Sequence, residues 1–181
     1  MTFEQLWAGW RRAYVEEASV SHREGKAGRE AGMCVFCGII ATGAPSADNG
    51  IVYRGELSCA LLNAYPYATG HLLVMPTRHL SGLAELTPDE SVSLWETTRT
   101  ALAVLDEAYD PDGANFGANL GRAAGAGIPS HLHLHALPRW SGDTNFMTAV
   151  AGVRVMPESL TDTWKKIHTA WTEHDARSKS L

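Results

Sequence analysis

The spacing of apolar residues predicts three amphipathic helices in this chain of 181 residues. Apolar side chains recur at helical spacing over residues 3–18 and again over about 158–174. The clearest helix is expected from Thr87 to about Tyr109, because Thr87 can act as the N-cap and Glu90 can complete a capping box. These helices occupy the two ends and the middle of the chain.

Short apolar runs between the helices predict strands. Residues 51–54 and 58–62 resemble the two arms of a hairpin, and residues 71–75 resemble a buried strand. Two further strands are expected over 115–119 and 131–137. The strands and helices do not alternate strictly, so the pattern favours an α+β fold with an antiparallel sheet.

The last of these segments, His131–Leu137, reads HLHLHAL. In a strand, side chains alternate between faces, so His131, His133 and His135 would share one face and the apolar residues the other. The row of imidazoles would span about 13 Å, which is too long for all three to reach one metal ion. The three histidines are therefore expected to take different roles in metal ligation, nucleophilic catalysis or acid–base chemistry.

A glycine-rich segment, Gly121–Gly127, comes just before the histidine row. It lacks the Gly-Lys-Ser/Thr ending of a Walker loop. Small residues nevertheless allow backbone N–H groups to approach an anion, and Asn119 can hydrogen-bond the same ligand. The alternative is an ordinary turn that connects two strands.

Cys34 and Cys37 form a Cys-x-x-Cys pair, which is typical of a redox site or of a metal site. Their surroundings do not resemble a thioredoxin unit, so metal binding is favoured. A closed tetrahedral zinc site needs two further ligands. The candidates are His71, His79 and His131.

Composition narrows the class of protein. The formal net charge is −5, which gives no support for binding nucleic acid by bulk attraction. No apolar run approaches the roughly 20 residues of a membrane span, and no signal-peptide core is present at the N-terminus. Three cysteines do not form a secreted disulfide framework. We therefore expect a cytoplasmic globular protein that binds neither nucleic acid nor membrane.

Several motifs accompany the histidine row. They are CVFC at 34–37, NAYPYATGHLLVMP at 63–76, Arg78-His79, Asn119-x-Gly121 and PRWSGDTNFM at 138–147. In this combination the chain resembles the histidine-triad (HIT) superfamily, and within it the diadenosine polyphosphate hydrolases and phosphorylases. The resemblance implies a HIT-like α+β fold, with an antiparallel sheet, a long helix and terminal helices.

The same resemblance suggests a domain organisation. It covers about residues 33–146, which would form the HIT domain. Residues 1–32 would form an N-terminal helix and linker, and residues 147–181 a C-terminal extension with a helix. It also implies a homodimer whose sheets join across the two-fold axis, or a dimer of dimers. We expect the N-terminal helix to contribute to that interface.

The resemblance further implies nucleotidyl transfer through a covalent histidine intermediate. His133 takes the role of the nucleophile that attacks the α-phosphorus of a nucleotide, and His135 and His71 hold oxygens of the phosphate or leaving group. The implied nucleotide-binding residues are Asn63 for the ribose, and Asn119, Gly125, Ala126 and Gly127 for the phosphate.

A structural zinc ion is implied as well. Its ligands would be Cys34, Cys37, His79 and His131, all of which are present. On this interpretation His131 faces the metal, whereas His133 and His135 face the nucleotide.

The chain departs from the family pattern at residues 126–128, which read Ala-Gly-Ile where many relatives have Gly-Gln-Ser/Thr. Side-chain donors to the phosphate are thereby lost, and a phosphate acceptor would need other donors, such as Arg122 or Arg139. We therefore favour hydrolysis of dinucleoside polyphosphates, with diadenosine tetraphosphate foremost. The alternatives are phosphorolysis, hydrolysis of nucleoside phosphoramidates, and a nucleotide-binding module without catalysis.

Overall fold

The computed structural model describes residues 34–144 and 156–179. The chain from Cys34 onward belongs to one compact unit. The helix and linker expected within residues 1–32 lie outside the described residues. None of the helices that the structure describes is both long enough and apolar enough to cross a membrane.

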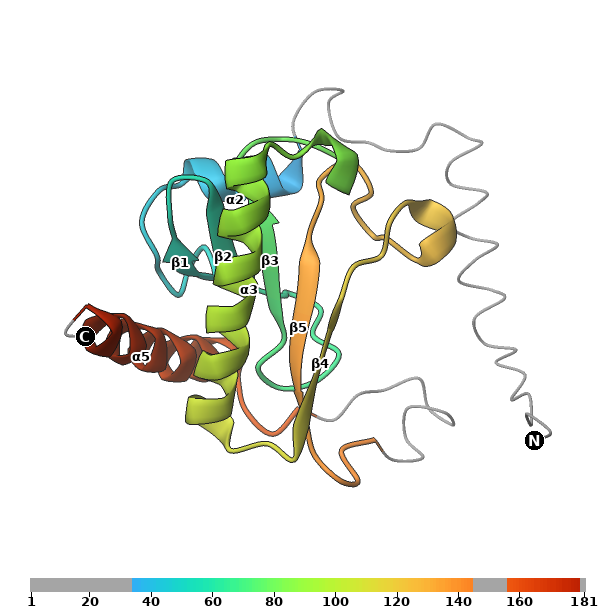
Figure 1. Ribbon diagram of the computed structural model, residues 1–181. Helices are drawn as coiled ribbons and strands as arrows, with labels where there is room; N and C mark the ends of the chain where they lie inside the picture. Colours follow the sequence, from blue (N-terminus) through green and yellow to red (C-terminus); the bar gives the residue numbers. More distant parts are fainter. Residues whose placement is uncertain (1–33, 145–155, 180–181) are drawn as a thin grey trace. The chain divides into compact units, whose positions relative to one another are not determined.

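Five antiparallel strands form one sheet in the order β1-β2-β3-β5-β4 (Figure 1). The strands are β1 (Ile51–Arg54), β2 (Ser58–Leu62), β3 (Leu72–Pro76), β4 (Gly113–Gly117) and β5 (Leu134–Arg139). The predicted hairpin and the buried third strand are confirmed. The fourth strand begins two residues before its predicted position, because its ladder with β5 pairs Gly113 with Arg139 and Gly117 with His135.

The prediction of a continuous strand over residues 131–137 is wrong for its first three residues, since β5 begins only at Leu134. Before that point the chain forms no strand ladder and bonds instead to the last residue of β3 and to the loop that follows it. The amide of Leu132 donates to Leu80 O at 2.7 Å, and His131 Nε2 donates to Pro76 O at 2.9 Å. The bond from Leu132 satisfies a backbone N–H that a strand ladder would otherwise use.

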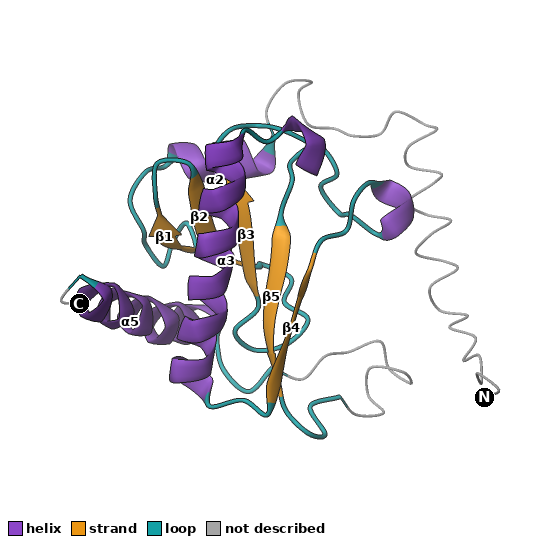
Figure 2. Cartoon of the chain, in the orientation of Figure 1, coloured by secondary structure: helices purple, strands orange, loops and turns teal. Residues whose placement is uncertain are grey.

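In the part of the chain that the structure describes, three α-helices flank the sheet (Figure 2). They are α2 (Val35–Ala41), α3 (Pro88–Tyr109) and α5 (Leu160–Ser178). The predicted capping box of α3 is confirmed, with Thr87 and Glu90 each bonding the other's backbone N–H. The last helix runs four residues beyond its predicted end. There His174 and Arg177 both bond Glu107 of α3, which stabilises the extra turn.

Two apolar clusters lie on opposite faces of the sheet, because alternate residues of the central strands point to opposite sides. In β3, Leu72 and Val74 join the cluster under α3 and α5, whereas Leu73 and Met75 join the smaller cluster under α2. Leu132 belongs to the larger cluster. His131 and His133, on either side of Leu132, contact Phe36 of α2 instead, so these two histidines lie toward α2.

Candidate active site and metal centre

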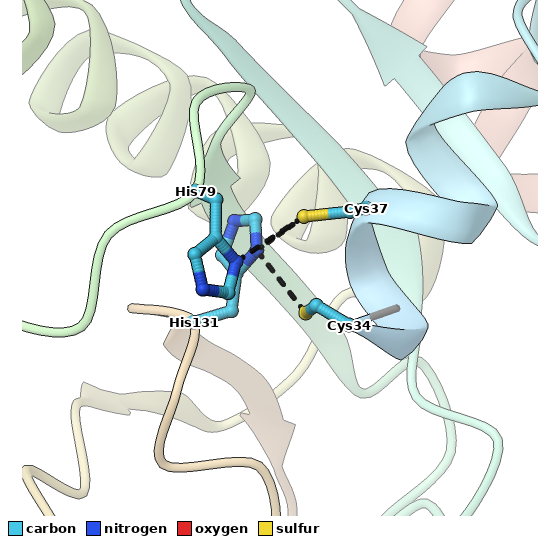
Figure 3. Close-up of side chains that lie close together, drawn as sticks. All are labelled: Cys34, Cys37, His79 and His131. Atoms are coloured by element: carbon cyan, nitrogen blue, oxygen red, sulfur yellow. Dashed lines mark hydrogen bonds between the residues drawn. The ribbon is translucent and has the colours of Figure 1, made fainter. Parts of the chain in front are cut away.

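Four side chains from distant parts of the chain converge at one end of α2 (Figure 3). Cys34 is the N-cap residue of this helix and Cys37 lies in its first turn, while His79 comes from the loop after β3 and His131 from the segment before β5. One ligand atom from each residue lies within 4.8 Å of all the others. The structure thus brings together all four predicted metal ligands in a group that can hold a metal ion.

His131 is oriented for ligation by its hydrogen bonds. Its Nε2 donates to Pro76 O, so the lone pair of Nδ1 points to Sγ of Cys37 at 3.5 Å and Sγ of Cys34 at 3.6 Å. Histidines that bind metals usually donate their other ring N–H to a carbonyl in this way. Burial lowers the pKa of His131, which favours the neutral imidazole that a metal requires.

The loop that carries His79 is fastened to the start of α3. Arg78 donates to both carboxylate oxygens of Glu90, at 2.7 and 2.8 Å, and to Glu85 O at 2.7 Å. The hydrogen bonds from Arg78 lower the pKa of Glu90 to about 2. Glu90 therefore acts both as a helix cap and as an anchor for the metal-site loop. The sequence predicted only the cap, since nothing in the spacing pairs Glu90 with Arg78.

His133 presents one unprotonated nitrogen to the site. Its Nδ1 donates to the carbonyl oxygen of His131 at 2.8 Å, so Nε2 keeps its lone pair. The ring is buried, and it lies 5.2 Å from the ring of His135, centroid to centroid. An imidazole held in this tautomer is suited to nucleophilic attack.

His71 and His135 form a directed pair. The amide of Tyr67 donates to Nδ1 of His71 at 3.0 Å, so His71 carries its proton on Nε2 and donates it to Nδ1 of His135 at 2.9 Å. The proton of neutral His135 is then on Nε2, which is buried and has no hydrogen-bond partner among the described residues. Burial lowers the pKa of His135 to about 4, so the ring is neutral at pH 7. A buried donor of this kind is suited to an oxygen of an anionic ligand.

The turn between β2 and β3 covers this pair. The ring of Tyr67 is stacked on His135, with centroids 5.6 Å apart, and is tilted against His71 at 4.6 Å. The side-chain nitrogen Nδ2 of Asn63 lies 3.2 Å from Nδ1 of His71. The side-chain oxygen Oδ1 of Asn63 accepts from the backbone N–H of Tyr65. Asn63, predicted to bind ribose, thus lies beside the catalytic candidates. The contribution of Tyr67 was not predicted from the sequence.

A groove of about 950 Å³ runs along α2. It is lined by Val35 and Ile39 of the helix, by the 44–50 loop, by Ala64 next to Asn63, and by Leu160 at the start of α5. Apolar walls with a few polar groups are typical of sites for small organic ligands.

The glycine-rich segment forms a turn between β4 and β5. Gly121 and Gly125 have φ values of +80° and +93°, which other residues rarely adopt. The amides of Gly125 and Ala126 bond within the turn, to Arg122 O and Gly121 O. Their predicted contacts with phosphate would require the turn to open.

The two arginines proposed for an acceptor phosphate differ in their availability. Arg139 forms a forked ion pair with Asp143 and also donates to Asn115, at the end of β5 away from His135. Arg122 is exposed and makes no ion pair with any residue that the structure describes. Only Arg122 therefore has a guanidinium available for an anion.

Comparisons with known proteins agree on one family. Residues 44–142 match the family model described as HIT domain. A Mycobacterium tuberculosis protein named AP-4-A phosphorylase is 39% identical over 168 residues, which cover 93% of this chain and 84% of that protein. The asymmetrical bis(5'-nucleosyl)-tetraphosphatase of Schizosaccharomyces pombe is 36% identical over 93 residues, covering 51% of this chain and 50% of that protein.

A solved structure shows the same fold. The crystal structure of a Zn-bound histidine triad family protein from Mycobacterium smegmatis superposes with a TM-score of 0.64 at 27% identity. The match covers 80% of this chain and 96% of that protein. The predicted α+β architecture with an antiparallel sheet is confirmed.

Proposed function

Because the chain belongs to the HIT domain family, we propose that it cleaves dinucleoside polyphosphates, with diadenosine tetraphosphate as substrate, through a nucleotide bonded to His133. The protonation pattern of the site carries this proposal. His133 offers the lone pair of Nε2, and the neighbouring His135 offers a buried N–H without a partner among the described residues. A nucleophile beside an unsatisfied donor is suited to an electrophile that bears an oxyanion, such as a phosphate.

In the first step, Nε2 of His133 attacks the α-phosphorus, and the bond from that phosphorus to the bridging oxygen breaks. Diadenosine tetraphosphate would thus leave AMP on His133 and release ATP. The proton on Nδ1 of His133 stays hydrogen-bonded to His131 O, which stabilises the positive charge that develops on the ring. The N–H of His135 donates to a phosphate oxygen on which negative charge accumulates.

For the second step we propose inorganic phosphate as the acceptor. An oxygen of phosphate would attack the same phosphorus, and the bond to His133 would break to give ADP. Support comes from the relative named AP-4-A phosphorylase, of which this chain matches 84%. The segment at 126–128 by itself favours water, because it supplies no polar side chain. Of the two candidate arginines, Arg122 is the one that makes no ion pair with the described residues.

The experiment is turnover of diadenosine tetraphosphate with and without phosphate, with the products separated. ATP plus ADP that requires phosphate is the expected result. ATP plus AMP at the same rate in both buffers would replace phosphorolysis by hydrolysis. No turnover of this substrate by the intact protein, together with turnover of adenosine 5'-phosphoramidate, would make the protein a phosphoramidase instead. His133→Ala is the control, and it should lose several powers of ten in rate while still binding nucleotide.

The groove along α2 is the proposed site of the adenosine that becomes AMP. Its apolar wall at Val35 and Ile39 is suited to the faces of a base, and Asn63, the residue before the lining residue Ala64, is proposed to bind the ribose hydroxyls. A second cavity is lined by His71, and it shares Leu62 and Leu160 with the lining of the groove. This arrangement would direct the α-phosphate toward the histidines.

A structural zinc ion is proposed for the Cys34–Cys37–His79–His131 group. Two sulfurs and two imidazole nitrogens suit the tetrahedral preference of zinc. Four protein ligands leave no coordination position for a substrate, so the metal would stabilise the fold and take no part in bond breaking. The Zn-bound relative from Mycobacterium smegmatis supports this choice of metal.

A homodimer that forms through the open edge of β4 is also proposed. Among the described residues this strand pairs only with β5, on one side, and its residues Gly113–Phe116 are exposed. Phe116 of β4 and Trp95 of α3 contact each other beside this edge and are 54% and 51% exposed. An unpaired edge with exposed aromatic residues is suited to a second copy of the chain.

A further inference from the structure

His131 connects the metal centre to the nucleophile through different atoms of one residue. Its Nδ1 faces the sulfurs of Cys34 and Cys37, and its Nε2 is bonded to Pro76 O. Its own carbonyl oxygen accepts the N–H of His133 at 2.8 Å. The side chain is buried. A displacement of this residue at the metal site would therefore also displace the group that fixes the tautomer of His133.

Phe36 provides a second connection. It lies between the two cysteines in the sequence, and its ring makes edge contacts with His131, at 5.7 Å between centroids, and with His133, at 5.1 Å. The ring is buried in the smaller apolar cluster. The phenyl ring of Phe36 thus packs against His131 of the metal centre and against His133, the proposed nucleophile.

The helix that carries Phe36 has little stability of its own. It has only seven residues, and its N-cap, Cys34, makes no side-chain capping bond. A helix of this length depends on tertiary contacts. Ligation of Cys34 and Cys37 would fix its first turn, and with it the position of the Phe36 ring.

From these contacts we propose that the metal centre positions the nucleophile, with Phe36 and the carbonyl of His131 as the coupling elements. The inference rests on the proposed roles of the metal and of His133. Phe36 is a positioning residue here, since it touches the nucleophile and takes no part in the reaction. Metal binding would then determine the orientation and tautomer of His133, in addition to stabilising the fold.

The first test reads the tautomer of His133 by ¹⁵N NMR of its ring nitrogens in the zinc-loaded protein without substrate. Wild type should show one tautomer, with the proton on Nδ1. Phe36→Leu keeps an apolar side chain and both cysteines, so zinc should still bind at one ion per chain. In this variant the proton of His133 should be distributed over both nitrogens. The rate of the nucleotidyl-histidine step should also fall about 10- to 100-fold, as for a misplaced reactive group.

Ile40→Ala is the matched control. Ile40 lies in the same helix and the same apolar cluster and is as buried as Phe36. Ile40 has no aromatic ring that could pack against His131 or His133. Its truncation should therefore lower the stability of the protein without changing the tautomer of His133. A single Nδ1–H tautomer and full rate in Phe36→Leu would overturn the proposal, as would equal effects of the two substitutions.

The second test removes zinc with a chelator and repeats the NMR measurement. If the protein stays folded, a mixed tautomer is the expected result, and an unchanged tautomer would overturn the coupling. If the protein unfolds without zinc, the tautomer of His133 in zinc-loaded Phe36→Leu decides whether the coupling exists. The NMR measurements need no substrate, so the coupling and the proposed reaction are tested separately. If the proposed reaction is wrong, the wild-type protein will show the Nδ1–H tautomer of His133 but will not cleave diadenosine tetraphosphate.

Discussion

At the residue scale, the partner of one ring nitrogen determines what the other nitrogen of each histidine can do. The carbonyls of Pro76 and His131 take the N–H groups of His131 and His133, and this leaves one lone pair toward the sulfurs and one toward the proposed substrate. In His135 the order is reversed, because His71 donates to Nδ1 and the proton on Nε2 is left buried and without a partner among the described residues. Similar residues in one short segment thereby acquire different chemistry.

Gly70 offers a test of the backbone next to His71. It has a φ of +79°, and a Cβ there would lie 3.1 Å from Pro138 and Tyr109. Gly70→Ala should lower the free energy of unfolding by more than the roughly 1–2 kcal/mol that the left-handed conformation alone costs. Gly43→Ala is the control, since Gly43 has a φ of +96° but no atom near the added Cβ. Equal losses in urea denaturation would show that the close contacts contribute nothing.

Residue types in the site were predictable from the sequence, but their hydrogen bonds were not. The row of histidines indicated divided roles, and the family resemblance selected His79 and His131 as partners of the two cysteines. Cys34 and His131 are 97 positions apart, and His71 and His135 are 64 apart. Spacing along the chain carries no information on such contacts, so the tautomers required the tertiary structure.

At the scale of elements, the sequence predicted those helices and strands whose position depends on residues close together in the chain. The β1–β2 hairpin and the capping box at Thr87 depend on residues close in sequence, and both lie where the sequence placed them. The start of β5 depends on Leu80 and Pro76, more than 50 positions earlier, and there the periodicity predicted a strand where the structure has isolated contacts with these two residues.

Glu90 connects the start of α3 to the metal-site loop, and its ionisation should be visible in stability. Its pKa in the folded protein is about 2, below the ordinary value of 4.5 for a glutamate. The stability contributed by the ionised form is thus fully present above about pH 4.5 and is lost as the pH falls toward 2. Thermal melts between pH 5 and 2 should show a steeper loss for wild type than for Glu90→Gln. Parallel curves would contradict this prediction.

The control for Glu90 is Glu96→Gln on the same helix. Glu96 pairs with Arg99 on the exposed surface, where such a pair contributes little. Its substitution should leave the pH dependence of unfolding unchanged.

At the scale of the whole molecule, a metal that joins α2, the loop after β3 and the segment before β5 should govern stability. Metal analysis of purified protein should give one zinc ion per chain, and Cys34→Ser should reduce that content. Chelation should lower the melting temperature, because the ion binds only the folded arrangement of its ligands. Cys59→Ser is the control for loss of a thiol, since Cys59 is buried in β2 and is not one of the four grouped metal ligands. A Cys34→Ser protein with full zinc content would contradict the site.

The exposed surface predicts that two copies of the chain assemble through the edge of β4. In a two-fold interface each substituted residue occurs twice and faces the same surface of the other copy. Phe116→Asp would therefore bring two new carboxylates into an apolar contact, where burial of unpaired charge is unfavourable. Light scattering at micromolar concentration should show a shift from dimer to monomer. Far-UV circular dichroism should confirm that the fold persists, because Phe116 is more than half exposed in one chain.

Tyr65→Asp is the matched control for this interface, since Tyr65 is an aromatic residue with 85% exposure that lies in the turn after β2, away from the β4 edge. It should leave the dimer intact. If Phe116→Asp also remains dimeric, the interface lies elsewhere, and deletion of residues 1–18 becomes the deciding experiment. Their apolar stripe of Phe3, Leu6, Trp7 and Trp10 is the other surface that the sequence offers to a second copy. A monomer after that deletion would place the contact at the N-terminal helix, and the open edge of β4 would then need to resist pairing by its glycines and short length alone.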